Sequence, residues 1–292
     1  MRQCARSKVD AKPEGLSPTA RWHYRTREGV GLACSDYGDA GPAVILLHGL
    51  CGHAGEWAET ASWLSKSYRV VAPEQRGHGR SNRNPADISR TAFVDDAVMW
   101  VEQLGLAPTV LVGHSLGGHT AFLLAARRPD LVSGLVVAEA TPKADPEAPA
   151  RVRAWLEAWP VPFTSYEQAI KFFGGNTLRA QVWASGLEQR NDGFWPRFEV
   201  SVMLAALNEI ACRSYWDEWA RIRCPVLVVR ARGAVPTGNT QRMVELVPHA
   251  RLVEIEKSGH DIHLDQPLRW RETLEAFLSA LDRRANKRVE SV

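Results

Sequence analysis

Residues 110–121 read VLVGHSLGGHTA, an apolar run that turns through a serine into a stretch of small residues. The valines favour a buried strand, and the alanines and leucines of 121–126 favour a helix. Glycines at 113 and 117 remove the Cβ atoms that would collide where a strand and a helix approach closely. The pattern predicts a tight strand–turn–helix unit that leaves the side chain of Ser115 accessible.

Helical and strand-like patterns alternate on both sides of this unit. Strand-like apolar runs lie at 43–47, 68–72, 134–138, 226–230 and 251–255, and helical spacing occurs at 56–64, 91–104, 241–247 and 270–281. A hairpin pattern at 22–37 precedes them, and the polar residues 1–20 are expected to form a flexible N-terminal extension. The order of strand, helix and strand predicts parallel crossovers, and therefore an α/β fold with a mostly parallel central sheet flanked by helices.

The composition changes between residues 142 and 221, where the alternation stops. This stretch holds six of the eleven tryptophans, Trp155, Trp159, Trp183, Trp195, Trp216 and Trp219. We interpret 142–221 as a helical cap, or lid, inserted into a core made of 21–141 and 222–292.

Bulk composition limits the possible partners. The chain has 292 residues with 45% hydrophobic content, enough for one sizeable core domain that carries a lid. The net charge of only +3 gives no indication of nucleic-acid binding. The chain contains no membrane-length apolar run, and its first residues lack a signal-peptide pattern, so we expect no membrane association and a cytoplasmic location. Five cysteines, an odd number without metal-ligand spacing, favour a reducing compartment. The histidines at 48, 53, 78, 114 and 119 also lack a metal-ligand spacing, so we expect no metal. We expect no cofactor, and the oligomeric state stays open.

Three separated motifs carry a resemblance to a known family. They are HGL at 48–50 after an early strand, GHSLG at 113–117, and SGH at 258–260 after the last strand, with RGHGRS at 76–81 as a fourth. In this order they resemble the motifs of the α/β-hydrolase family, and the resemblance extends from about residue 21 to 281. It implies that Ser115 is a nucleophile on a sharp "elbow" and that His260 is its general base. It also implies that the backbone N–H groups of Leu50 and Leu116 form the oxyanion hole.

The acidic partner of His260 departs from the commonest pattern. Relatives usually carry an Asp just after the strand at 226–230, yet no Asp or Glu lies between Glu218 and Glu245, and Ala234 stands about where the acid would fall. A subset of the family, including some lactonases, takes its acid from the strand after the elbow helix, and there this chain has Glu139. We therefore predict the catalytic triad Ser115, His260 and Glu139.

The aromatic lid suggests a hydrophobic substrate. Trp155 and Trp183, together with His114, are the predicted substrate contacts. The expected function is that of a serine hydrolase that cleaves a bulky hydrophobic carboxylic ester or lactone through an acyl-enzyme, without a cofactor. Two alternatives stay open: hydrolysis of a carbon–carbon bond next to a carbonyl, and a ligand receptor with little turnover. Ser115 argues against epoxide hydrolase and dehalogenase chemistry, which in this family uses an Asp nucleophile.

Overall fold

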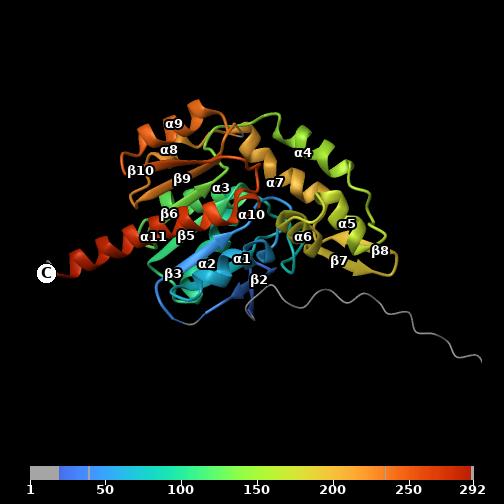
Figure 1. Cartoon of the computed structure of the whole chain (residues 1–292), viewed down its shortest axis with the longest axis horizontal. Coiled ribbons are helices and arrows are strands. Elements are labelled where there is room, and N and C mark those ends of the chain that lie inside the picture. Colours follow the sequence, from blue (N-terminus) through green and yellow to red (C-terminus); the bar gives the residue numbers. More distant parts are fainter. Residues whose placement is uncertain (1–19, 39, 234, 291–292) are drawn as a thin grey trace, which may run out of the picture.

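The computed structural model describes residues 20–38, 40–233 and 235–290, with side chains through residue 284. The predicted extension at 1–20 lies almost entirely outside this part of the chain, and so does Ala234. Figure 1 shows a sheet with helices packed against it, and a separate group of helices and short strands at one end.

Eight strands of the described chain form one twisted sheet. They are β1 (Arg21–Arg27), β2 (Val30–Asp36), β3 (Ala43–Leu47), β4 (Arg69–Glu74), β5 (Thr109–His114), β6 (Val132–Ala138), β9 (Val226–Ala231) and β10 (Ala250–Ile255). Their order across the sheet is β1-β2-β4-β3-β5-β6-β9-β10. β1 pairs antiparallel with β2, and β2 pairs antiparallel with β4, whereas every other pair is parallel.

Helices cover both faces of this sheet. They are η1 (Ala54–Trp57), α1 (Ala58–Leu64), α2 (Arg90–Gln103), α3 (Leu116–Arg127), α8 (Trp216–Trp219), α9 (Thr237–Leu246), α10 (Ile262–Asp265) and α11 (Pro267–Glu290). Alternate residues of a strand point to opposite faces, so Val44 and Leu46 join the apolar cluster with α1 and α11. Ile45 and Leu47 join the cluster with α2 and α3 on the other face. Burial on both faces explains the continuous apolar strands, and the predicted α/β class is confirmed.

The segment between β6 and α8 folds over the carboxyl end of the sheet. It contains α4 (Ala148–Glu157), α5 (Tyr166–Phe173), α6 (Leu178–Ser185), β7 (Leu187–Arg190), β8 (Gly193–Pro196) and α7 (Val200–Cys212). We call this segment the cap. Many of its apolar side chains form a cluster around Trp159 and Phe163, which Cys51 and Leu50 of the core also join.

Two details of the cap differ from the sequence interpretation. β7 and β8 form an antiparallel hairpin, which the sequence analysis missed because four-residue strands are too short to show a period of two. The tryptophans of α8 pack on the core and not on the cap: the Trp219 ring lies 5.6 Å from that of Phe122, and its indole N–H donates to the carbonyl of Met243. Composition alone had assigned Trp216 and Trp219 to the lid.

Candidate active site

The turn between β5 and α3 holds Ser115 in a strained conformation. Its φ is 50° and its ψ is −115°, a region that side chains other than glycine rarely occupy. A Cβ atom at Gly117 would lie 2.1 Å from the carbonyl oxygen of Leu47, so only glycine allows α3 to pass this close to β3. The N–H of Ser115 donates to the carbonyl of Ala138 at 2.8 Å, which fixes the turn against β6. The predicted strand–turn–helix is confirmed.

Backbone strain concentrates around this serine. Five residues other than glycine have a positive φ in the described chain, and four of them follow strands that end at one edge of the sheet. These four are Cys51 after β3, Ser115 after β5, Glu139 after β6 and Lys257 after β10. Strained residues persist where the surrounding structure fixes them, and they cluster at functional sites. The carboxyl edge of the sheet is therefore the candidate site.

The structure brings Glu139 and His260 together as the sequence predicted. The Nδ1 atom of His260 lies 3.3 Å from Oε2 of Glu139, and Oε1 of the same carboxylate accepts the N–H of Ala231 at 2.6 Å. Ala231 ends β9, the strand after which relatives usually carry the acid. This strand end now contributes a backbone donor that orients Glu139, whose side chain is only 1% exposed. A fixed carboxylate on Nδ1 leaves the Nε2 atom of His260 free to act as a base.

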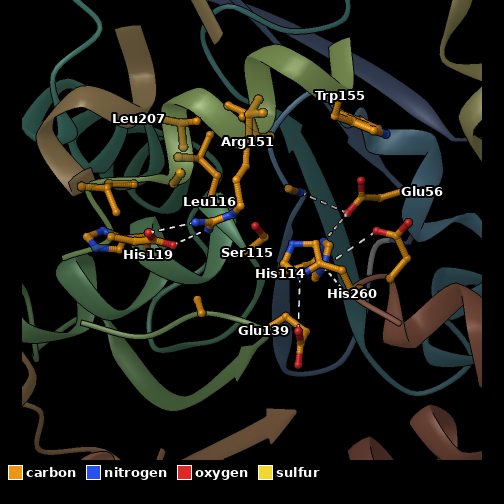
Figure 2. A pocket seen from close by; sticks show the side chains of 18 of the residues that line it. Glu56, His114, Ser115, Leu116, His119, Glu139, Arg151, Trp155, Leu207 and His260 are labelled. Atoms are coloured by element: carbon orange, nitrogen blue, oxygen red, sulfur yellow. Dashed lines mark hydrogen bonds and ion pairs between the residues drawn. The ribbon is translucent and has the colours of Figure 1, made fainter. Parts of the chain in front are cut away.

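Ser115 and His260 face the same space above the sheet edge (Figure 2). Among the described residues, the hydroxyl of Ser115 forms no hydrogen bond with His260, whose side chain is 55% exposed. Catalytic hydrogen bonds of this kind are often long until a substrate is bound.

The loop after β3 is held by two neutral histidines. His48 accepts the N–H of Gln75 and donates to the carbonyl of Gly49, and His78 accepts the N–H of Cys51. Burial lowers the pKa of His78 to about 4, so its ring remains a neutral acceptor. None of the described groups accepts a hydrogen bond from the N–H of Leu50 or from that of Leu116. Both donors are thus available for the predicted oxyanion hole.

His114 lies in a buried charge network next to the candidate catalytic residue His260. Its Nε2 donates to the carbonyl oxygen of His260 at 2.8 Å, and its Nδ1 lies 3.7 Å from Oε1 of Glu56. Burial by itself lowers the pKa of His114, but Glu56, Asp261 and the His260 carbonyl outweigh it and raise the pKa to about 9. His263 lies 3.6 Å from the same Glu56 oxygen, and burial lowers its pKa. His114 therefore carries the proton, and it ties the His260 loop to η1.

The same three residues are the described group that could hold a metal ion. The ligand atoms of Glu56, His114 and His263 lie within 4.8 Å of one another, and all three residues are buried. The sequence prediction of no metal considered the histidines but not Glu56, and it stays a prediction. The cationic His114 beside the carboxylate of Glu56 balances the charge of this cluster without an ion.

The raised pKa of His114 predicts a loss of stability at alkaline pH. Folding raises this pKa from an unfolded value near 6.5 to about 9, so its stabilisation is complete below about pH 6.5 and disappears as the pH rises through 9. In urea unfolding, the difference in free energy of unfolding between wild type and His114→Asn should shrink by about 3 kcal/mol from pH 6 to pH 10. His249→Asn changes an exposed histidine and is the matched control. A difference that does not vary with pH would contradict a charged His114.

A cavity of about 650 Å³ opens between the sheet edge and the cap. Ser115, Glu139 and His260 line its floor, with Leu50 and Leu116 beside them. Trp155 and Trp183 line the cap side with their rings 5.5 Å apart, and the Trp183 indole donates to Asp261 at 2.9 Å. His114 borders the cavity but is only 3% exposed, and its Nε2 hydrogen is already used by His260. The three predicted substrate contacts thus surround the cavity, although contact with a substrate stays a prediction.

The sequence analysis missed several polar residues of this cavity. Lys143, Arg151 and Arg179 line it from the cap side, and His119 lines it from α3. Neither ring nitrogen of His119 has a hydrogen-bond partner among the described residues, and burial lowers its pKa, so the ring is neutral. Arg151 fits the ordinary polar pattern of an amphipathic helix, so nothing in the sequence indicated that its side chain faces Ser115.

A family comparison agrees with this fold. Residues 42–267 match the model of the alpha/beta hydrolase fold, and the chain belongs to that family. In the described chain, no helix combines the length and hydropathy needed to cross a membrane.

Among its relatives, this chain is 25% identical over 248 residues to (E)-2-((N-methylformamido)methylene)succinate hydrolase of Acinetobacter baylyi, covering 82% of this chain and 90% of the relative. It is 28% identical to a diacylglycerol lipase of Mus musculus, in an alignment that covers 82% of this chain and 81% of the relative. The solved structure of E-2-(acetamidomethylene)succinate hydrolase superimposes with a TM-score of 0.80 at 22% identity, covering 88% of this chain and all of the other. An enol-lactonase of Burkholderia xenovorans has a TM-score of 0.70 at 21% identity, covering 88% of this chain and all of the other. The relatives named here are hydrolases.

Proposed function

We propose that this chain is a serine hydrolase that cleaves a carboxylic ester or a lactone through an acyl-enzyme at Ser115. The observation that carries the proposal is the contact between Glu139 and the Nδ1 atom of His260. The loop that holds His260 faces Ser115, whose backbone is strained. A serine hydroxyl needs a base to become a nucleophile, and a histidine needs its tautomer fixed to act as one. The names of a lipase and an enol-lactonase among the similar proteins support ester chemistry.

The proposed reaction has two stages. His260 Nε2 takes the proton of Ser115 as the hydroxyl attacks the ester carbonyl, and the N–H groups of Leu50 and Leu116 stabilise the oxyanion. The imidazolium then protonates the leaving alcohol, and an acyl-Ser115 remains. Water attacks this acyl group with His260 as base, which releases the carboxylic acid and restores the serine.

The walls of the cavity support a substrate with a substantial apolar part. Aromatic and aliphatic side chains contribute most of the cap side, namely Val152, Trp155, Phe172, Phe173, Trp183, Leu207 and Ile210. A cavity of about 650 Å³ is in the usual range for small-molecule sites. We therefore retain the predicted hydrophobic ester or lactone as the substrate class.

Comparison of wild type with Ser115→Ala tests the proposal. The panel consists of 4-nitrophenyl butyrate, a small lactone and a 1,3-diketone. We expect turnover of the ester or the lactone, and a loss of at least about 10³-fold in kcat for Ser115→Ala, because the nucleophile is removed. Cleavage of the diketone alone would favour the carbon–carbon hydrolase. Saturable quenching of tryptophan fluorescence without turnover of any probe would favour a ligand receptor. Full activity in Ser115→Ala would overturn the assignment.

A further inference from the structure

The cap side of the cavity carries an excess of positive charge. Of the charged residues that line the cavity, Lys143, Arg151 and Arg179 come from the cap side, where they face the single acid Asp145. The remaining acids are already used within the site. Glu139 is bound by His260, Glu56 lies beside the cationic His114, and Asp261 accepts the indole N–H of Trp183. These three acids lie at the floor of the cavity, whereas its cap side, with three cations and one acid, is positive.

Arg151 is the cation best placed to meet a substrate. Figure 2 shows its side chain reaching from α4 toward the space beside Ser115 and Leu116. Its two terminal nitrogens donate to the two carboxylate oxygens of Asp145, at 3.2 Å and 2.5 Å. This planar fork is the geometry that recognises a carboxylate. Asp145 thus occupies the position that a carboxylate of a ligand would take.

The pair of Arg151 and Asp145 is weak enough to exchange. Their side chains are 59% and 46% exposed, and exposed ion pairs contribute little to stability. Lys143 lies close by in sequence, and its ammonium group forms no ion pair with any residue that the structure describes. Arg179 differs, because its Nε lies 3.4 Å from Asp265 of α10, whose side chain is only 18% exposed and is therefore harder to displace. Lys143 and Arg151 are therefore the two cations available to a ligand.

We propose that the substrate carries a carboxylate in addition to its scissile ester, and that Arg151 and Lys143 bind this carboxylate under the cap. The inference rests on the proposed hydrolase function and adds its substrate class. The apolar walls hold the chain between the two groups, and the guanidinium of Arg151 exchanges Asp145 for the carboxylate of the substrate. A fixed anion at one end positions the ester carbonyl over Ser115.

A matched pair of esters tests this proposal. Monoethyl adipate and ethyl hexanoate differ only by a terminal carboxylate in place of a methyl group. We expect wild type to prefer monoethyl adipate by about tenfold in kcat/KM, and added NaCl to reduce this preference. In Arg151→Met the ratio of kcat/KM for monoethyl adipate to that for ethyl hexanoate should fall to near one. Lys143→Met should have a smaller effect, and Asp145→Asn should increase the preference because it removes the competing carboxylate.

Arg153→Met is the matched control. Arg153 lies on the same helix, is similarly exposed and pairs with Glu157, but does not line the cavity. The ester preference should be unchanged in this variant. Equal kcat/KM values for the two esters in wild type would overturn the proposal. So would a preference for monoethyl adipate that persists in Arg151→Met.

A binding measurement separates this proposal from the proposed function. The affinities of Ser115→Ala for monoethyl adipate and ethyl hexanoate can be compared through the fluorescence of the cap tryptophans. Tighter binding of monoethyl adipate, lost in the double variant with Arg151→Met, would support the carboxylate site even if neither ester is turned over. Hydrolysis of both esters that depends on Ser115 but shows no preference would leave the hydrolase standing and remove the carboxylate site.

Discussion

Glu139→Gln is expected to lower kcat by about 10³- to 10⁴-fold and to leave the fold and KM nearly unchanged. The reason lies in the two bonds of this carboxylate, one from the N–H of Ala231 and one from Nδ1 of His260. In the variant, the amide oxygen would remain on the Ala231 N–H, and the amide NH₂ would then face Nδ1. His260 would have to accept at Nδ1 and carry its proton on Nε2, and this tautomer cannot take a proton from Ser115.

Steady-state kinetics with the best ester of the panel checks this prediction, with circular dichroism to show that the variant folds. Glu139→Asp is the matched control, because it keeps the charge and shortens the reach, and it should retain more activity than the amide variant. A Glu139→Gln variant within tenfold of wild type would show that another group orients His260.

Gly117→Ala is expected to have the largest effect on stability. Its added Cβ would lie 2.1 Å from the carbonyl oxygen and 2.5 Å from the carbonyl carbon of Leu47, which are backbone atoms of a buried strand. Neither β3 nor α3 can move away without breaking its pairing, so we expect a loss of more than about 4 kcal/mol, seen as insoluble protein or a much lower urea midpoint.

Gly31→Ala is the control for this prediction, because a Cβ at Gly31 has no atom within 4 Å and its φ is not positive. It should change the free energy of unfolding by no more than about 0.5 kcal/mol. A Gly117→Ala protein with the urea midpoint of wild type would contradict the close approach of strand and helix at the elbow.

The sequence allowed the sheet, the elbow and the contact between Glu139 and His260 to be predicted because their signals are local. Each buried strand is a continuous apolar run, and the elbow needs glycines at fixed offsets from Ser115. Glu139 could be predicted because one strand end lacked an acid and the next candidate strand ended in one. The structure adds that the strand with the missing acid still takes part, through the N–H of Ala231.

The remaining parts of the site depend on contacts between residues far apart in the sequence. Glu56 reads as an ordinary helical glutamate, and only the packing of η1 under the elbow brings it to His114. Arg151 looks like a solvated residue of an amphipathic helix until the orientation of α4 turns it toward the cavity. The tryptophans of α8 likewise needed the path of the chain to assign them to the core. No spacing rule connects such residues, so the charge pattern of the cavity becomes visible only in three dimensions.

The most direct test of the central claim is to locate the covalent intermediate. Wild-type protein is mixed with an aryl ester, quenched in acid within the first turnovers, digested and analysed by mass spectrometry. The proposed mechanism predicts an acyl group on the peptide that contains Ser115, and no such group in Ser115→Ala. In a His260→Ala variant that is acylated with a reactive ester, the acyl group should persist for longer. An acyl group on Cys51 or elsewhere, with turnover preserved in Ser115→Ala, would contradict it.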